Sequence, residues 1–177
     1  MAGSGTHSST TAGARSAGRP APDGRRGADR GLCAFWLAGR CFGLDVRWVG
    51  EVVALEAMTR VPNARPAIRG LFNLRGEPVV VLDLSEILEL GDRDQPGGKI
   101  GLVLRMGELT AVVQVERVES IIPPGRGELA LRGDGEHRAV IGLLDDRSSG
   151  GRVVTVLDSE LLLERLQALR YLTDADD

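Results

Sequence analysis

The order of apolar and polar residues predicts a chain built mainly of short β-strands. From Leu32 onward, short apolar runs are separated by glycine, proline or charged pairs, which is the spacing of hairpin-linked strands. Turns are expected at Gly39-Arg40, Arg75-Gly76 and Gly107-Glu108, because glycine beside a polar residue favours a tight connection. The expected strands cover residues 32–38, 41–46, 51–58, 68–74, 77–84, 100–106, 109–115, 118–122, 139–146 and 152–158.

Two segments change to helical spacing. Residues 85–90 (SEILEL) predict a short helix, with Ser85 near its N-cap and Gly91 after its last turn. Residues 159–172 predict a longer helix, because Leu162, Leu166 and Leu169 fall on one face. The glycine- and charge-rich segments at 91–99 and 125–138 are expected to be loops.

The chain also repeats part of its own pattern. VVVLDLSEIL (79–88) is answered by VVTVLDSELL (153–162). Chance repetition of Val-x-Val is the alternative, but two blocks that match in the same order favour internal symmetry. The sequence therefore predicts two similar β units side by side. The other block recurs after 69 positions (113 − 44 = 69), with Leu44, Val46, Val49, Val52 and Val53 answered by Val113, Val115, Val118, Ile121 and Ile122.

Composition and charge narrow the classes of partner. Residues 1–30 contain no large aliphatic residue after Met1, which predicts a disordered tail ahead of a folded body at 31–177. The tail holds five arginines against Asp23 and Asp29, so the body keeps 17 basic and 23 acidic residues, a net charge of −6. An acidic body with 3% aromatic residues argues against nucleic acid as a ligand. No apolar stretch has the length of a membrane span or of a signal-peptide core, so a soluble protein without direct membrane insertion is expected.

Candidate chemistry is sparse. Cys33 and Cys41 lie in apolar surroundings without a metal-binding spacing, which favours buried, reduced thiols. The two histidines, His7 and His137, lie in a tail and a loop, far from any paired nucleophile. No cofactor-binding glycine motif or metal cluster is evident, so neither an enzyme nor a cofactor is indicated.

Four aspartates follow apolar strands and have simple structural interpretations. Asp83 and Asp158 each precede a predicted helix, where a capping side chain is expected. Asp145 and Asp146 could form a carboxylate pair with perturbed protonation, but a solvated turn is the simpler explanation.

Arg75 is the residue that raises a functional question. It lies in NLRG (73–76), between two apolar strands, and a buried guanidinium without a partner would be costly. At a hairpin turn, its stem can pack along the core while its head reaches out. Two roles stay open: a structural arginine satisfied within the domain, with Glu51 as a candidate partner, or a fixed cation offered to another protein.

The motifs around Arg75 resemble the CheW-like adaptor family of bacterial chemotaxis. The matching elements are Phe42 to Val46, Val49 to Val52, Pro66 to Gly70, Asn73 to Gly76 and Pro78 to Leu84, and the resemblance extends over about residues 32–170. It implies a mostly β fold of two pseudo-symmetric, SH3-like five-stranded β-barrels with a hydrophobic groove between them, short helices and a C-terminal helix.

The resemblance also implies a non-catalytic function. Family members couple the cytoplasmic tip helices of chemoreceptors to a CheA-type histidine kinase, as cytoplasmic proteins recruited to membrane-associated receptor arrays. The kinase-contacting residues do not carry over. The family's receptor-binding positions fall on Val49, Glu51, Gly70, Asn73, Arg75, Ile100, Val118 and Ile121.

Two departures from the family pattern affect the second half of the chain. Val112 stands where the family has a glycine, which is expected to alter the groove, and Glu116 replaces an aspartate. The alternative function is a β-barrel protein, either an enzyme or a small-molecule binder, that uses the groove between the barrels for its ligand.

Overall fold

A computed structural model describes residues 31–91, 98–131, 139–146 and 151–171, without the side chains of Arg170 and Tyr171. The predicted tail, both histidines and most of the predicted loops lie outside these residues. The first half holds β1 (Leu32–Leu37), β2 (Arg40–Asp45), η1 (Val46–Trp48), β3 (Val49–Ala54), β4 (Met58–Thr59), β5 (Ile68–Leu74), β6 (Glu77–Asp83) and α2 (Leu84–Ile87). The second half holds β7 (Ile100–Met106), β8 (Leu109–Val115), β9 (Arg117–Ile122), β10 (Glu128–Leu131), β11 (Val140–Asp146), β12 (Arg152–Leu157) and α3 (Ser159–Tyr171).

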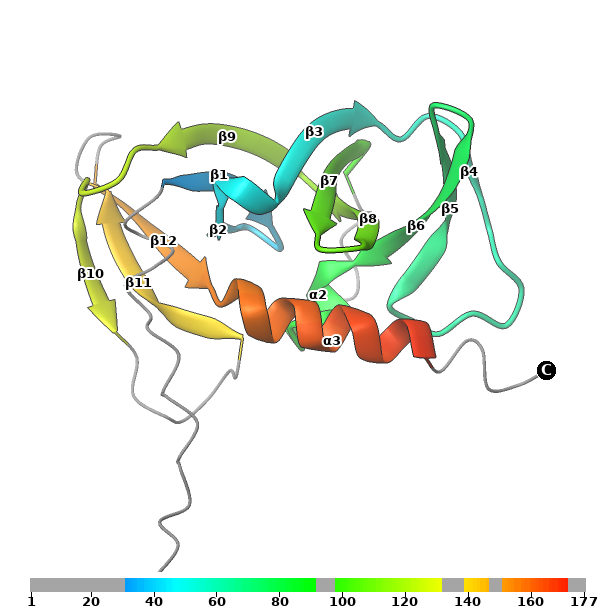
Figure 1. Ribbon diagram of the computed structural model, residues 1–177. Coiled ribbons are helices and arrows are strands. Elements are labelled where there is room, and N and C mark those ends of the chain that lie inside the picture. Colours follow the sequence, from blue (N-terminus) through cyan, green and yellow to red (C-terminus); the bar gives the residue numbers. More distant parts are fainter. Residues whose placement is uncertain (1–30, 92–97, 132–138, 147–150, 172–177) are drawn as a thin grey trace, which may run out of the picture.

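The strands form two sheets, which lie in the left and right halves of Figure 1. Sheet A has the order β10-β11-β12-β2-β1-β9, and sheet B has the order β3-β7-β8-β6-β5-β4. The predicted mostly β fold with two β subdomains is confirmed. Each sheet has six strands instead of five, because the short strands β4 and β10 each add an edge. The sequence hid both: β4 merges with the apolar run before it, and β10 lies in a segment whose glycines and charges predicted a loop.

The predicted internal symmetry is present in the topology. When β1 to β6 are matched with β7 to β12, the two sheets have the same strand order. The halves are not separate units, however. The β1–β2 hairpin belongs to the sheet of β9 to β12, and the β7–β8 hairpin belongs to the sheet of β3 to β6. Each exchanged hairpin is paired on both sides in its new sheet: β2 is parallel to β12 and β1 antiparallel to β9, while β8 is parallel to β6 and β7 antiparallel to β3.

A short helical turn sends the chain from sheet A to sheet B. Asp45 ends β2, is buried, and caps η1 by accepting a hydrogen bond from the Arg47 N–H at 3.0 Å. The Arg47 side chain closes the turn with an ion pair to the same carboxylate, 2.6 Å from Nη2 to Oδ2. This charged corner, which has a buried carboxylate and a half-exposed guanidinium, fixes where the chain passes from β2 to β3.

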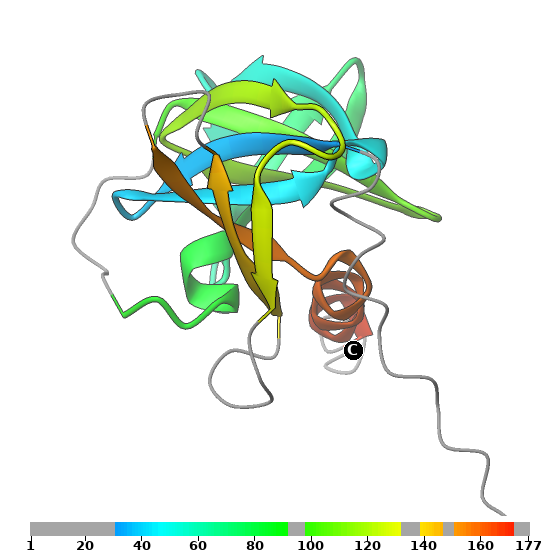
Figure 2. The same cartoon turned by 90° about the vertical axis from the view of Figure 1, so that its left-hand side faces the viewer.

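The main hydrophobic core is shared by both sheets and both helices. Phe35 and Phe42 of sheet A, fully buried and stacked with centroids 6.1 Å apart, lie in one cluster with residues of sheet B, α2 and α3. Helix α3 extends beneath both sheets in Figure 1 and is seen end-on below the strands in Figure 2. The predicted leucine stripe of α3 is confirmed, since Leu162 and Leu166 are buried and Leu169 packs at the edge.

Several smaller predictions can also be compared with the structure. Asp83 and Asp158 do cap the helices that follow them; Asp83, and not Ser85, is the N-cap of α2. Both cysteines are free and buried, as expected. The interpretation of Asp146 as a solvated residue is wrong. It is buried and pairs with Arg152 across the β11–β12 ladder, Nη2 to Oδ2 at 3.1 Å, and its partner is six residues further along the chain.

Candidate functional site

The β5–β6 turn holds Arg75 outside the core. Leu74 is buried, while Arg75 and Gly76 both adopt left-handed backbone angles (φ 56° and 95°), the pattern of a tight hairpin turn. Asn73 stabilises the turn, because its Oδ1 accepts a hydrogen bond from the Gly76 N–H at 2.6 Å. The Arg75 side chain is therefore positioned by the backbone and remains 76% exposed.

The internal partner of Arg75 is Glu51 on β3. Arg75 Nη2 lies 2.8 Å from Glu51 Oε2, and Arg105 Nη2 on β7 lies 3.4 Å from Glu51 Oε1. One carboxylate thus faces two arginines, and it is itself only 26% exposed. An ion pair this open to water contributes about 0–1 kcal/mol to folding. Breaking the pair between Arg75 and Glu51 would therefore cost the protein little stability.

Three of the predicted apolar residues lie at the margin of the shared core. Val49 on β3, Ile100 on β7 and Val118 on β9 are half-buried and pack against the main cluster. β3 pairs with β7, with Ala54 opposite Ile100, so two of these residues share a sheet with Glu51. Val118 comes from sheet A, where it lies opposite Phe35. Strands β3 and β9 lie on the same side of the molecule in Figures 1 and 2.

The last two predicted site residues have different surroundings. Ile121 on β9 is 57% exposed, and belongs to sheet A. Gly70 is buried, and a Cβ built on it would lie 2.4 Å from the Thr59 carbonyl oxygen of β4. Gly70 has no side chain that could contact a partner. Glycine is required at this position because β5 and β4 approach each other too closely for a Cβ.

Three residues were missed by the sequence analysis or had another role there: Arg105, Val112 and Glu116. Arg105 was not identified; its place as the polar residue of an apolar strand was the available signal. Val112, the departure from the family glycine, is fully buried within sheet B. Gly101 on the neighbouring strand makes room for it, since a Cβ there would lie 2.5 Å from Val112 Cγ1. Glu116 accepts a hydrogen bond from the Gly39 N–H at 3.0 Å and so holds the β1–β2 turn.

Metal-ligating clusters and membrane-spanning helices are both absent from the described residues. Within the described ranges, no three His, Cys, Asp or Glu side chains gather in a way that could hold a metal ion. No helix in the described part of the chain is long and apolar enough to cross a membrane. The fold and the site define a two-sheet β protein that presents a charged hairpin beside the margin of a shared apolar core.

Comparison with known proteins identifies the family to which this two-sheet β protein belongs. A model of the CheW-like domain matches residues 32–167, most of the chain, so the protein belongs to the CheW-like family. The resemblance inferred from NLRG and its neighbouring motifs is confirmed.

Individual relatives are distant. The chain is 30% identical over 109 residues to the chemotaxis protein CheW of Treponema pallidum, covering 52% of this chain and 62% of that protein. It is 25% identical over 137 residues to chemotaxis protein CheW of Thermotoga maritima, covering 76% of this chain and 88% of that protein. Among solved structures, it resembles the scaffolding protein TtCheW from Thermoanaerobacter tengcongensis. The TM-score is 0.61 at 24% identity, and the match covers 73% of this chain and 89% of the other. At that identity the structural likeness supports the fold.

Proposed function

We propose that this protein is a non-catalytic adaptor that couples chemoreceptors to a CheA-type histidine kinase in chemotaxis or a related signalling pathway. Family membership supports the proposal, as do relatives that are themselves named chemotaxis or scaffolding proteins. The receptor partner is a cytoplasmic tip helix, and the adaptor joins membrane-associated receptor arrays through its partners.

The observation that carries the proposal is the placement of Arg75. A left-handed turn aims an exposed guanidinium outward beside Glu51, on the sheet whose margin carries Val49 and Ile100. A receptor helix that lays an apolar stripe against this margin would gain about 25 cal/mol per Å² of buried apolar surface, before the cost of association. Arg75 would fix the register of the helix through a charge-assisted hydrogen bond to a carboxylate or carbonyl oxygen.

The other predicted residues contribute in different ways to this receptor site. Glu51 and Asn73 hold Arg75 in place, Val118 and Ile121 extend the apolar surface from sheet A, and Gly70 keeps β4 against β5. The kinase contacts a separate face of the protein. Each contact can be of modest affinity, because partners held together in an array meet at high effective concentration.

Charge reversal at Arg75 tests the receptor site. Arg75→Glu should weaken capture of a receptor's cytoplasmic fragment by at least about tenfold, a loss of about 1.4 kcal/mol. The thermal midpoint should fall by no more than about 4 °C, because an exposed ion pair contributes at most about 1 kcal/mol. The matched control is Arg126→Glu, an exposed arginine between β9 and β10, which should leave capture unchanged.

A double substitution separates binding from local structure. Glu51→Arg combined with Arg75→Glu, in a chain where Arg105→Gln removes the second arginine beside position 51, restores an ion pair between the same two positions with its charges exchanged. If receptor capture returned with the ion pair, Arg75 would have only a structural role and the site assignment would fail. Capture that stays weak while the protein remains folded supports direct contact between Arg75 and the receptor.

A further inference from the structure

Strands β2 and β12 of sheet A separate after a very short pairing and open a pocket. Only Thr155 with Phe42 and Val156 with Gly43 are paired between them. Beyond these pairs, the two strands border a pocket of about 590 Å³, which is within the range of small-molecule sites. Its lining is completed by Trp36, Gly39 and Glu119 from the neighbouring strands and turn.

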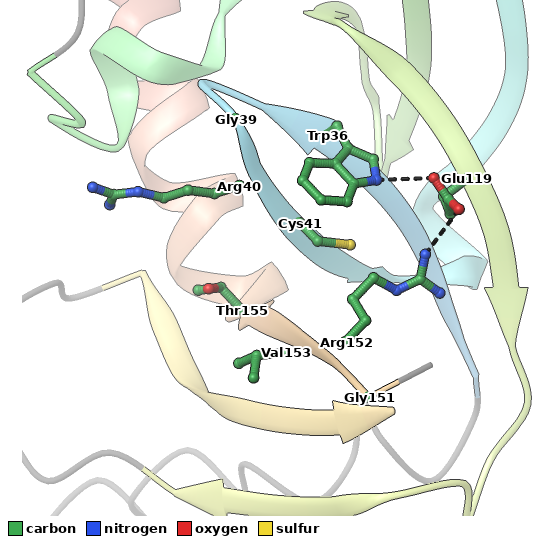
Figure 3. A pocket seen from close by; sticks show the side chains of 9 residues that line it. All are labelled: Trp36, Gly39, Arg40, Cys41, Glu119, Gly151, Arg152, Val153 and Thr155. Atoms are coloured by element: carbon green, nitrogen blue, oxygen red, sulfur yellow. Dashed lines mark hydrogen bonds and ion pairs between the residues drawn. The ribbon is translucent and has the colours of Figure 1, made fainter. Parts of the chain in front are cut away.

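The polar wall of the pocket is a connected network. Arg152 Nη1 forms an ion pair with Glu119 Oε1 at 3.0 Å, and Arg152 Nη2 donates a hydrogen bond to Asp146 Oδ2 at 3.1 Å. Glu119 also accepts from Trp36 Nε1 at 2.9 Å, and the dashed lines of Figure 3 mark its bonds to Trp36 and Arg152. Each of these side chains is fixed by a contact with another one, so the polar wall is preorganised in the absence of a ligand.

The network keeps capacity for one more oxygen. Arg152 is only 11% exposed, and its Nε–H is buried without an acceptor among the described residues. A buried donor in this state costs stability, and a ligand oxygen would recover that cost only if the Arg152 side chain turned to present Nε to the pocket. Three guanidinium groups, those of Arg40, Arg117 and Arg152, are balanced by three carboxylates around the pocket, those of Glu116, Glu119 and Asp146, so the Arg152 guanidinium itself, and not a net charge, would select an anion.

The remaining wall is suited to a flat apolar group. The indole of Trp36 lines the pocket, with the Arg117 guanidinium 4.2 Å from its ring centroid. In Figure 3 the Cys41 thiol lies between Trp36 and Arg152, Val153 and Thr155 border the opening, and the Arg40 side chain extends away from it. Aromatic rings stack well on such a surface.

We infer that this pocket binds a small aromatic carboxylate, with its ring against Trp36 and its carboxylate at the Arg152 guanidinium. The inference is independent of the receptor site, which uses Arg75 on sheet B. The same group could come from a free acid or from a peptide that ends in an aromatic residue.

Fluorescence offers a direct test, because the chain has two tryptophans. In the Trp48→Phe variant, Trp36 is the remaining tryptophan and reports on the pocket alone. Phenylacetate should change its emission saturably, and neutral phenylacetamide should bind at least tenfold more weakly. A pentapeptide ending in phenylalanine, compared with its amidated form, identifies the source of the carboxylate: tighter binding of the free peptide than of phenylacetate would indicate a peptide terminus.

Variants test the anchor. Arg152→Lys keeps a charge for Asp146 but lacks the guanidinium, and should weaken phenylacetate at least tenfold, whereas Arg75→Gln should leave it unchanged. If Arg152→Lys fails to fold, Arg40→Gln should still weaken binding measurably, because it removes one of the positive charges around the pocket. In a Cys33→Ala chain, phenylacetate should also slow alkylation of Cys41. The inference is overturned if no saturable change occurs, if the amide binds as tightly as the acid, or if folded Arg152 variants bind normally.

Discussion

Substitution of Gly70 tests whether a residue of the predicted receptor site acts by packing or by contact. Gly70→Ala would place a Cβ 2.4 Å from the Thr59 carbonyl oxygen and 2.9 Å from Met58 Cγ. Thr59 pairs with Leu71 in the β4–β5 ladder, so this oxygen can move only if the ladder shifts. Overpacking of this kind costs about 1–3 kcal/mol.

The expected loss appears directly in unfolding experiments. For a chain of this size, about 2 kcal/mol corresponds to a fall of roughly 4–8 °C in the thermal midpoint. Urea denaturation followed by tryptophan emission gives the free energy of unfolding independently. Receptor capture measured well below the midpoint should stay near that of the wild type, because the variant removes no contacting side chain.

Gly50→Ala is the matched control on β3. The three atoms nearest to a Cβ there all belong to the Arg105 side chain, with Nε at 2.9 Å, and that exposed side chain can move aside. Its unfolding free energy should therefore change by less than about 0.5 kcal/mol. Equal stability of Gly70→Ala and the wild type, or an equal loss in Gly50→Ala, would refute the packing argument.

Three further predictions concern the helices, the thiols and the charge cluster. Asp158→Ala removes the side chain that caps α3 and should cost about 0.5–2 kcal/mol in thermal unfolding followed by circular dichroism, while Asp158→Asn should keep most of that stability. Burial raises the pKa of Cys33 and Cys41, so both thiols should react slowly with a disulfide reagent at pH 8 until urea is added; fast labelling of the native protein would contradict their burial. Hydrogen bonds from Arg117 and then Trp36 lower the pKa of Glu119, so its stabilising effect is fully present above the ordinary glutamate pKa and is lost as the pH falls through the lowered value. The emission of Trp36, in a chain without the other tryptophan, should report a midpoint below that of ordinary glutamate.

Local pattern was sufficient to predict most elements of this fold. The turn at Arg75-Gly76, the leucine face of α3 and the aspartate caps all depend on residues close in the sequence, so the chain itself reveals them. The internal repeat predicted two related sheets because the matched blocks keep their order. Neither the local pattern nor the repeat indicates which hairpin joins which sheet. A strand has the same alternation of apolar and polar residues whichever sheet it belongs to.

Long-range pairs account for what the sequence did not reveal. Glu51 could be proposed as a partner of Arg75, but Arg105 on the same carboxylate is 54 residues away. The pocket depends on Trp36 and Glu119, separated by 83 residues, and on the burial of Asp146 beside Arg152. None of these residues carries a motif, so only the assembled sheets reveal the cluster.

The exchange of hairpins makes the two halves of this chain mutually dependent. Neither half can complete a sheet alone, because each lacks the two strands that it lends to the other. To separate the two halves, the protein would have to break the pairings β1–β9, β2–β12, β3–β7 and β6–β8 as well as a common core. An adaptor built in this way would resist separation of its two halves under force. A displacement imposed by a partner at one sheet would therefore be transmitted to a partner bound at the other sheet.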